Sequence, residues 1–252
     1  MKDMEVTVIE NREVIKDHFL LKAKVKGRIP AFRPGQFVMV KIQGPQVFLR
    51  RPFTAYECEK DTISILYKVK GVGTRVLSKM KRGEKTFILG PCGRGFSITE
   101  RELYVVIAGG IGVAGVNLLI KSLKKNVWIF FGTSSSSNLS LLGNLTNYDL
   151  FISTLDGTYG KKGDVISLFR EKIDDLKNKD VEIFACGPKE MYKSLKDALL
   201  KYRLPCQVLY EERMACGMGL CFGCVVETLD PKDPIKRVCY EGPVFSLWEL
   251  SL

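Results

Sequence analysis

Four of the eight cysteines fall close together near the end of the chain. Cys216, Cys221 and Cys224 follow the pattern C-x4-C-x2-C, and Cys239 comes after fourteen further residues. Thiolates at this spacing ligate the two irons of plant-type [2Fe–2S] clusters, with three ligands from one tight loop and one from a later segment. Such a cluster takes up one electron at a time. The pattern therefore predicts an electron carrier.

The residues around these ligands favour a cluster over other uses of cysteine. Gly217, Gly219 and Gly223 leave room for the loop to wrap the cluster and to aim backbone N–H groups at its sulfurs. Zinc is the open alternative, although zinc sites of four cysteines usually pair two similar C-x2-4-C units. Disulfides fit less well, because a chain of 252 residues can bury a core without them. We interpret the remaining cysteines as small buried residues or thiols beside a site: Cys58, Cys92, Cys186 and Cys206.

The composition and the first residues are those of a globular protein that is not exported. Hydrophobic residues make up 46% of the chain and charged residues 27%. The N-terminus lacks the apolar core of an export signal. The uncharged run Leu103–Ile120 has the minimal length of a membrane span, but the glycines in its middle indicate strand, turn and helix instead. Together with free cysteines, these features predict a cytoplasmic protein that does not associate with membranes.

The net charge of +11 is unevenly distributed. From Cys206 to the C-terminus, four Lys and Arg residues stand against seven Asp and Glu residues, a net charge of −3, so the first 205 residues carry +14. The basic residues are dispersed and do not form a stripe with aromatic residues, so we do not expect nucleic-acid binding. We interpret them as a solvated surface that attracts an anionic dinucleotide or a partner subunit.

Two blocks of secondary structure precede the cysteine segment, and their patterns differ. In residues 1–98, short strands alternate with Gly/Pro turns, which predicts an antiparallel β-barrel. In residues 99–205, strands alternate with helices, which predicts a parallel sheet covered by helices. Residues 206–252 form a third, loop-rich segment. The predicted strands are Val6–Ile9, Phe37–Val40, Thr62–Leu66, Thr86–Leu89, Leu103–Ala108, Val127–Phe131, Leu150–Thr154 and Val181–Ala185, and the predicted helices are Val113–Lys124, Val165–Lys177 and Lys189–Tyr202.

The barrel block carries residues suited to a flavin. Arg51, Pro52, Phe53 and Thr54 combine a cation for a pyrophosphate, a ring to lie near the isoalloxazine and a hydroxyl for its reactive nitrogen. A purely structural role for this Arg-Pro pair stays open. Gly73 and Thr74 follow a strand and can bring the backbone close to a phosphate, or they form a plain turn into a helix at Val76–Met80.

The second block carries a glycine loop typical of dinucleotide sites. Gly110 and Gly112 open a G-x-G-x-x-G sequence between a predicted strand and a predicted helix. Phosphate is stabilised at such a helix N-terminus. The acidic residue that usually grips the ribose about twenty positions later is missing. A later strand ends at Cys186, Gly187 and Pro188, at the edge where ligands gather in open α/β sheets.

Hydrolytic or phosphotransfer machinery is not evident in the sequence. His18 is the only histidine, and we interpret it as a surface or half-buried residue. No G-x-S-x-G sequence and no metal-binding histidine pair are present. The chemistry therefore depends on bound redox groups.

In this order, Arg51 to Thr54, the two glycine loops and Cys186 to Pro188 resemble the ferredoxin–NADP reductase superfamily. The C-terminal sequence from Glu212 to Val226, followed by Val238 to Phe245, resembles more narrowly the electron-transfer subunits of dihydroorotate dehydrogenase B, over essentially the whole chain. The resemblance implies an FAD-binding barrel, an NAD-binding domain and a [2Fe–2S] segment. It also implies that Leu66, Tyr67 and Lys68 contact FAD together with Arg51–Thr54, Gly73 and Thr74, and that Cys216, Cys221, Cys224 and Cys239 ligate the cluster.

The resemblance further implies a partner and a direction of electron flow. In that family the subunit pairs with an FMN-containing catalytic subunit that oxidises dihydroorotate, in pyrimidine biosynthesis, and we expect two copies of each. FAD stands between cluster and NAD(H) because it exchanges electrons both singly and in pairs. Two alternatives stay open: the small subunit of another flavin/iron–sulfur complex, such as a sulfhydrogenase, sulfite reductase or transhydrogenase, and a zinc-ribbon binding protein without enzymatic activity.

Overall fold

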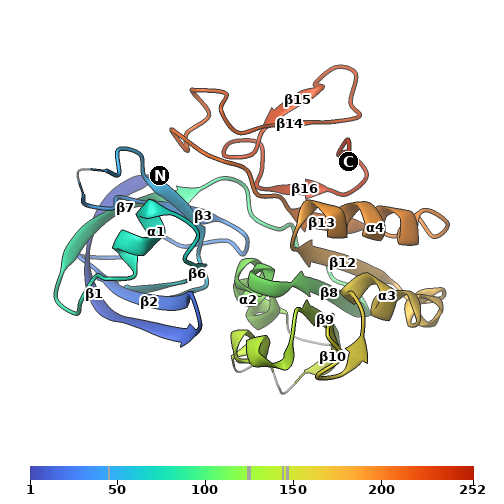
Figure 1. The fold of residues 1–252 in the computed structure, drawn as a ribbon. Coiled ribbons are helices and arrows are strands. Elements are labelled where there is room, and N and C mark those ends of the chain that lie inside the picture. Colours follow the sequence, from blue (N-terminus) through green and yellow to red (C-terminus); the bar gives the residue numbers. More distant parts are fainter. Residues whose placement is uncertain (45, 124–125, 144, 146–147) are drawn as a thin grey trace.

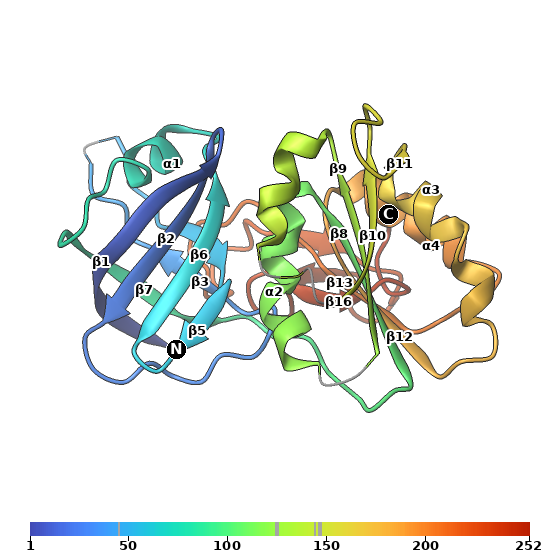
Figure 2. The same cartoon turned by 90° about the horizontal axis from the view of Figure 1, so that it is seen from below.

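The computed structural model describes residues 1–44, 46–123, 126–143, 145 and 148–252. It has three parts: an antiparallel half-barrel, a mostly parallel sheet between helices, and a loop-rich segment at the C-terminus (Figure 1). The half-barrel and the sheet lie side by side, with helix α2 (Val113–Ser122) between them (Figure 2). This arrangement confirms the fold class expected from the sequence.

The half-barrel is one seven-stranded antiparallel sheet in the order β4-β3-β7-β1-β2-β6-β5. Buried aliphatic side chains of alternating strand positions fill its interior. All four strands predicted in this block lie within it. Its helix differs from the prediction, since α1 begins at Val72 rather than Val76. The Thr74 hydroxyl accepts hydrogen bonds from the Lys70 and Gly71 amides, and these bonds stabilise an earlier first turn. The elements are β1 (Lys2–Ile15), β2 (His18–Val25), β3 (Phe37–Val40), β4 (Arg51–Thr54), β5 (Glu57–Glu59), β6 (Thr62–Lys68), α1 (Val72–Leu77) and β7 (Lys85–Cys92).

The second sheet has the order β11-β10-β9-β8-β12-β13-β16, parallel except for β16, which runs antiparallel to β13. Helix α2 packs on the face toward the half-barrel, and α3 and α4 cover the other face (Figure 2). The uncharged run from Leu103 to Ile120 forms a strand, a turn and a helix, as predicted, and no helix in the described parts of the chain is long and apolar enough to span a membrane. The elements are β8 (Leu103–Gly109), β9 (Val127–Thr133), β10 (Asp149–Thr154), β11 (Lys161–Lys162), α3 (Val165–Arg170), β12 (Val181–Cys186), α4 (Lys189–Leu199), β13 (Cys206–Leu209) and β16 (Val244–Ser246), with 3-10 turns η1 (Gly110–Gly112), η2 (Ser136–Leu142) and η4 (Ile173–Leu176).

Two predicted helices are shorter than expected. The chain predicted as one helix from Val165 to Lys177 leaves the α-helix after Arg170 and continues as η4. Ile173 and Leu176 still reach the core, because a three-residue spacing suits the 3-10 period. Helix α4 ends at Leu199 rather than at residue 202. The predicted end of α2 at Lys124 lies outside the described residues, and α2 ends at Ser122.

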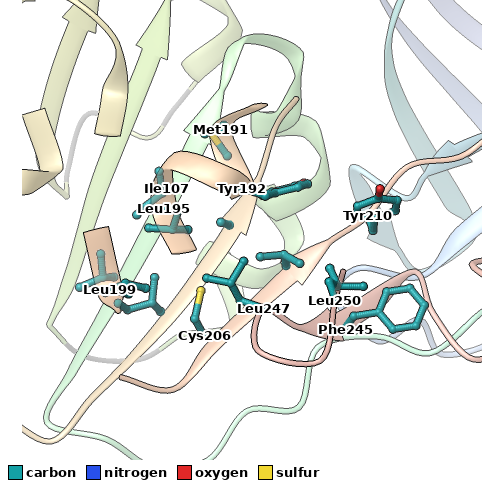
Figure 3. Packing of buried hydrophobic residues seen from close by; sticks show 14 of the residues in the cluster. Ile107, Met191, Tyr192, Leu195, Leu199, Cys206, Tyr210, Phe245, Leu247 and Leu250 are labelled. Carbon is teal, nitrogen blue, oxygen red and sulfur yellow. The ribbon is translucent and has the colours of Figure 1, made fainter. Parts of the chain in front are cut away.

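The C-terminal segment is built into the second sheet. Cys206–Leu209, which the sequence analysis assigned to the cysteine segment, is strand β13 and pairs in parallel with β12. The segment then forms the hairpin of β14 (Val225–Glu227) and β15 (Ile235–Arg237) and returns as β16 to the edge of the same sheet. Leu247 and Leu250 pack with Leu195 of α4 in one hydrophobic cluster (Figure 3). The expected boundary at residue 206 therefore cuts through a continuous core.

The same segment also contacts the half-barrel. A Cβ on Gly217 would lie 2.6 Å from the Met39 side chain of β3. Arg94 after β7 forms a bridge with Pro243 just before β16. These contacts fix the cysteine loop between half-barrel and sheet.

Candidate functional site

A cavity between half-barrel and sheet gathers most of the residues predicted to bind a flavin. It encloses about 990 Å³, part of it open to solvent. Among its walls are Arg51, Pro52, Phe53, Thr54, Leu66, Tyr67, Lys68 and Thr74, joined from the sheet side by Ile111, Ala114 and Gly115. Curling of the half-barrel brings β4 into contact with β6, so the residues predicted to bind the flavin on these two strands share one wall. Pro52 is tolerated because β4 is an edge strand.

Gly73 and Arg51 pack against each other beside this cavity. A Cβ at Gly73 would lie 3.0 Å from Arg51 Nε, so the glycine lets the arginine side chain lie flat against α1. Arg51 Nη1 also donates to the Leu49 carbonyl at 2.6 Å. These contacts hold a cation at the mouth of the cavity, beside Thr74. A fixed guanidinium at this place is suited to a pyrophosphate.

Tyr67 has a buried ring whose edge reaches the cavity. The ring lies 5.8 Å from that of Phe19 and 5.6 Å from that of Phe53, and its hydroxyl donates to Asn11 Oδ1. Burial raises the pKa of Tyr67. The residue therefore acts as a rigid neutral wall rather than as a proton donor.

Sequence reasoning missed the residues that follow β13. Tyr210, Glu211, Glu212 and Met214 line the same cavity. Burial raises the pKa of Glu211, and Lys70 partly offsets this effect. The signal was in the sequence, since these residues directly follow a strand of the sheet, but they were assigned to the cysteine segment.

A second cavity adjoins the first and lies at the carboxyl ends of β8 and β12. The sheet order reverses here, because β9 and β12 flank β8 on opposite sides, and such points collect ligands. The two cavities share Lys68, Lys70 and Ile111 as walls. Of the predicted dinucleotide residues, Gly110 and Pro188 line the second cavity. Its other walls include Gly109, Thr133, Ser134, Asn138, Asp164 and Met191.

Gly112, Cys186 and Gly187 lie directly behind this cavity wall. A Cβ on Gly112 would collide with the Cys186 carbonyl, and one on Gly115 would lie 2.6 Å from the Cys186 sulfur. These glycines thus allow η1 and α2 to pack on β12. Burial raises the pKa of the Cys186 thiol well above its usual value. The structure places Cys186 as a packing residue under α2.

His18 is a further wall of the second cavity that the sequence analysis missed. It was interpreted as a surface or half-buried residue, but it is buried, because β2 pairs with β6 at this point and places it beside Lys68. Its Nδ1 lies 2.8 Å from the Lys16 carbonyl. Since a carbonyl oxygen only accepts, Nδ1 donates to it, which leaves Nε2 as the ring nitrogen for another hydrogen-bond partner.

The four predicted cluster ligands lie in two pairs. Cys224 and Cys239 are buried, and the Cys239 amide donates to the Cys224 sulfur at 3.4 Å. Cys216 and Cys221 lie nearer the surface and share a thiol hydrogen bond. Each pair can serve one iron of a two-iron cluster.

Backbone amides point at these sulfurs. Gly219 N donates to Cys239 at 3.1 Å, and Met218 N to Cys216 at 3.4 Å. Burial acts to raise the pKa of Cys216, but hydrogen bonds from the backbone amides of the loop and from Cys221 outweigh it and lower the pKa to about 6. In the buried pair, burial and the Cys224 contact raise the pKa of Cys239 to about 12. Left-handed backbone at Gly217 and Gly219 turns the amides inward.

The pairing of the sulfurs suits a two-iron cluster, in which each iron would take two of the four thiolates. Within the described residues, no group of three or more His, Cys, Asp or Glu side chains is arranged to hold a metal ion.

Comparison with known proteins decides the family. The chain is 37% identical over 248 residues to the dihydroorotate dehydrogenase B (NAD(+)) electron transfer subunit of Caldanaerobacter subterraneus subsp. tengcongensis, with 96% of each chain covered. This chain belongs to the family of dihydroorotate dehydrogenase B electron transfer subunits. A homolog of this subunit in Aquifex aeolicus is 36% identical over 263 residues and covers both chains fully.

The family's cysteine segment and its fold are also found separately. Residues 211–251 match the iron–sulfur cluster binding domain of dihydroorotate dehydrogenase B. The match includes the four cysteines and excludes β13, in agreement with the place of that strand in the second sheet. The solved structure of an NADH-dependent reduced ferredoxin–NADP oxidoreductase superposes with a TM-score of 0.84 at 24% identity, covering 98% of this chain and 89% of that one. The dihydroorotate dehydrogenase B subunit thus has the ferredoxin–NADP reductase fold.

Proposed function

We propose that this subunit carries electrons from an FMN-containing catalytic subunit, through a [2Fe–2S] cluster and FAD, to NAD⁺. The main support is that three candidate sites, namely the two cavities and the cysteine loop, adjoin one another. The two cavities share Lys68, Lys70 and Ile111, and Met214, two residues before Cys216, lines the first cavity. Electrons can therefore pass along a short path within the chain.

The first cavity suits FAD. Arg51 offers a fixed guanidinium for the pyrophosphate, and Thr54 offers a hydroxyl on the paired edge strand β4. FAD, when bound, exchanges electrons singly with a cluster and in pairs with a nicotinamide, which is the conversion that this subunit needs. Phe53 and Tyr67 form an apolar wall that restricts the entry of water.

The second cavity suits NAD(H). Gly110 precedes α2, so free N–H groups and the helix dipole favour the phosphates there. Lys68 and Lys70 add positive charge from the half-barrel side. Thr133, Ser134 and Asn138 offer hydroxyls and an amide to a ribose. Cys186, Gly187 and Gly112 support this wall from behind.

The cysteine loop suits the cluster and a partner. Cys216, Cys221, Cys224 and Cys239 would hold it, with backbone amides already directed at all four sulfurs. The loop exposes apolar side chains, which mark an interaction surface: Met218, Leu220 and Phe222. We assign this face to the FMN-containing subunit, in an assembly with two copies of each subunit that works in pyrimidine biosynthesis in the cytoplasm.

Activity of the separated subunits tests this proposal. The isolated chain should show visible flavin and iron–sulfur absorption and should reduce artificial dyes with NADH. It should not oxidise dihydroorotate until the FMN-containing subunit is added, when orotate and NADH should form together. A colourless chain, or orotate formation by the chain alone, would contradict the assignment.

A further inference from the structure

The Arg237 side chain lies between two exposed aromatic rings of the cysteine segment. Its guanidinium carbon is 4.8 Å from the centre of the Phe222 ring and 4.7 Å from that of the Tyr240 ring. Phe222 belongs to the ligand loop and Tyr240 follows the fourth ligand, Cys239. The two cation–π contacts restrict the position of the guanidinium.

The edges of the guanidinium are also bound. Nη1 donates to the Gly219 carbonyl at 2.7 Å, Nε donates to Glu241 Oε2 at 3.1 Å, and Nη2 pairs with Glu241 Oε1. This two-point pairing fixes the orientation of the guanidinium as well as its position.

Gly219 links this arginine to a cluster sulfur. Its carbonyl accepts from Arg237, while its own N–H donates to the Cys239 sulfur at 3.1 Å. The residue adopts φ +81°, and a Cβ there would lie 2.9 Å from the Tyr240 side chain. The position of the amide at the sulfur therefore depends on a glycine turn that Arg237 holds from the other side.

The Arg237 main chain organises the fourth ligand as well. Its carbonyl accepts from the Tyr240 and Glu241 amides and closes a turn around Cys239. The next residue, Val238, donates to the Cys224 carbonyl at 2.8 Å. Both ligands of the buried pair are thus tied to the strand that carries Arg237.

We propose that Arg237 is a positioning residue that couples the exposed face of the cysteine segment to the cluster. It holds Gly219 so that the amide stays on the Cys239 sulfur, and it holds the Phe222 and Tyr240 rings in the orientation that a partner meets. Hydrogen bonds to cluster sulfurs raise the reduction potential. Loss of these Arg237 contacts, which we call the clamp, should therefore lower the reduction potential of the cluster and broaden the lines of its EPR spectrum. The inference rests on the proposed iron–sulfur function.

Three variants in the full chain separate positioning from charge. Arg237→Gln removes the two-point pairing with Glu241 together with a positive charge. Glu241→Gln weakens the same pairing but removes a negative charge. Lys236→Gln is the control, because it removes a neighbouring cation, paired with Glu249, that contacts neither Gly219 nor the two rings. Iron and sulfide content, the reduced-state EPR spectrum and the midpoint potential are measured for each, with NADH-to-dye turnover as a check on the rest of the fold.

The proposal expects Arg237→Gln and Glu241→Gln both to lower the potential and broaden the EPR lines, and Lys236→Gln to leave both unchanged. A pure charge effect predicts opposite shifts for Arg237→Gln and Glu241→Gln, and similar shifts for Arg237→Gln and Lys236→Gln; that result would overturn it. A fourth variant, Arg237→Lys, restores the charge without the two-point pairing, so loss of iron from both Arg237→Gln and Arg237→Lys with dye turnover kept would support the proposal. A wild-type chain without iron would overturn the proposed function itself, whereas wild-type spectra in every variant would overturn only the clamp.

Discussion

The Cys186 carbonyl occupies the space where a side chain on Gly112 would begin. We expect Gly112→Ala to force η1 away from β12, at a cost of about 1–3 kcal/mol for overpacking. The glycine loop would move with it, so the KM for NADH should rise together with a fall in melting temperature. Gly71→Ala is the control, because a Cβ at Gly71 meets nothing within 4 Å. An unchanged melting temperature in Gly112→Ala would show that the close approach relaxes freely.

The glycine loop also shows what the sequence could and could not reveal. The G-x-G-x-x-G spacing correctly predicted a turn between a strand and a helix, because the backbone conformation of a short turn depends mainly on its own residues. It could not show that Gly112 and Gly115 face Cys186, since that contact depends on which strand lies beside β8. Cys186 therefore looked like a residue at a ligand edge, whereas the structure places it in the core.

The half-barrel gives the same lesson at longer range. Period-two patterns predicted its strands, yet the burial of His18 comes from the pairing of β2 with β6, which no local pattern encodes. Tyr210 and Glu211 were not expected in the first cavity, because the cysteine motif led us to assign the chain from Cys206 onward to a separate segment, whereas Cys206–Leu209 pairs with β12. The ligand spacing, in contrast, needed no tertiary information, since three of the four cysteines share one loop.

Replacing Cys224 by Ser should remove the cluster but leave FAD and much of the NADH-to-dye activity. Cys224 is buried beside Cys239 and does not line the first cavity, whose candidate flavin residues lie mainly on β4 and β6. Iron content and flavin absorbance are the measurements. Cys58→Ser on β5 is the matched control and should keep both cofactors. Loss of FAD from Cys224→Ser would mean that the cysteine loop is part of the flavin site.

NADH should be preferred to NADPH by about tenfold or more in kcat/KM, a difference of about 1.4 kcal/mol. Among the described walls of the second cavity, the end of β9 offers Thr133 and Ser134, and the cations Lys68 and Lys70 lie on the half-barrel side. Asp164 adds a negative charge: burial acts to raise its pKa, but hydrogen bonds from Ser167 and from the α3 amides outweigh this and lower it.

Asp164→Asn isolates that charge, because asparagine caps a helix as well as aspartate does. The variant should keep its stability and use NADPH better relative to NADH. Equal kcat/KM values for the two coenzymes in the wild-type chain would contradict the preference, and an unchanged ratio in Asp164→Asn would place the discrimination elsewhere.

His18→Ala should raise the KM for NADH about fivefold, the effect of one hydrogen bond of about 1 kcal/mol. Nδ1 is engaged by the Lys16 carbonyl, so Nε2 is the ring nitrogen left for a hydrogen bond with a ligand in the cavity. His18→Gln keeps a polar group, so its KM for NADH should lie between those of the wild type and of His18→Ala. FAD content and kcat with dyes should change little, because His18 lines only the second cavity among the two. A wild-type KM in His18→Ala would assign the histidine to packing.

Leu220→Asp should weaken assembly with the FMN-containing subunit while NADH-to-dye activity persists. The Leu220 side chain is 76% exposed, beside the ligand Cys221, and Phe222 is 58% exposed on the same loop. A buried apolar contact at the centre of an interface costs about 2 kcal/mol or more when it is lost, which corresponds to roughly thirtyfold weaker binding. Leu220 is the cleaner probe, since Phe222 also contacts Arg237.

Leu200→Asp is the control for this prediction. Leu200 is 60% exposed but lies at the end of α4, away from the cysteine loop (Figure 1). Titration of each variant with the partner in the ultracentrifuge measures the dissociation constants. Equal constants for Leu220→Asp and wild type would place the docking face elsewhere, whereas a loss confined to Leu220→Asp would support docking of the partner over Cys216 and Cys221, where we propose that electrons enter the chain.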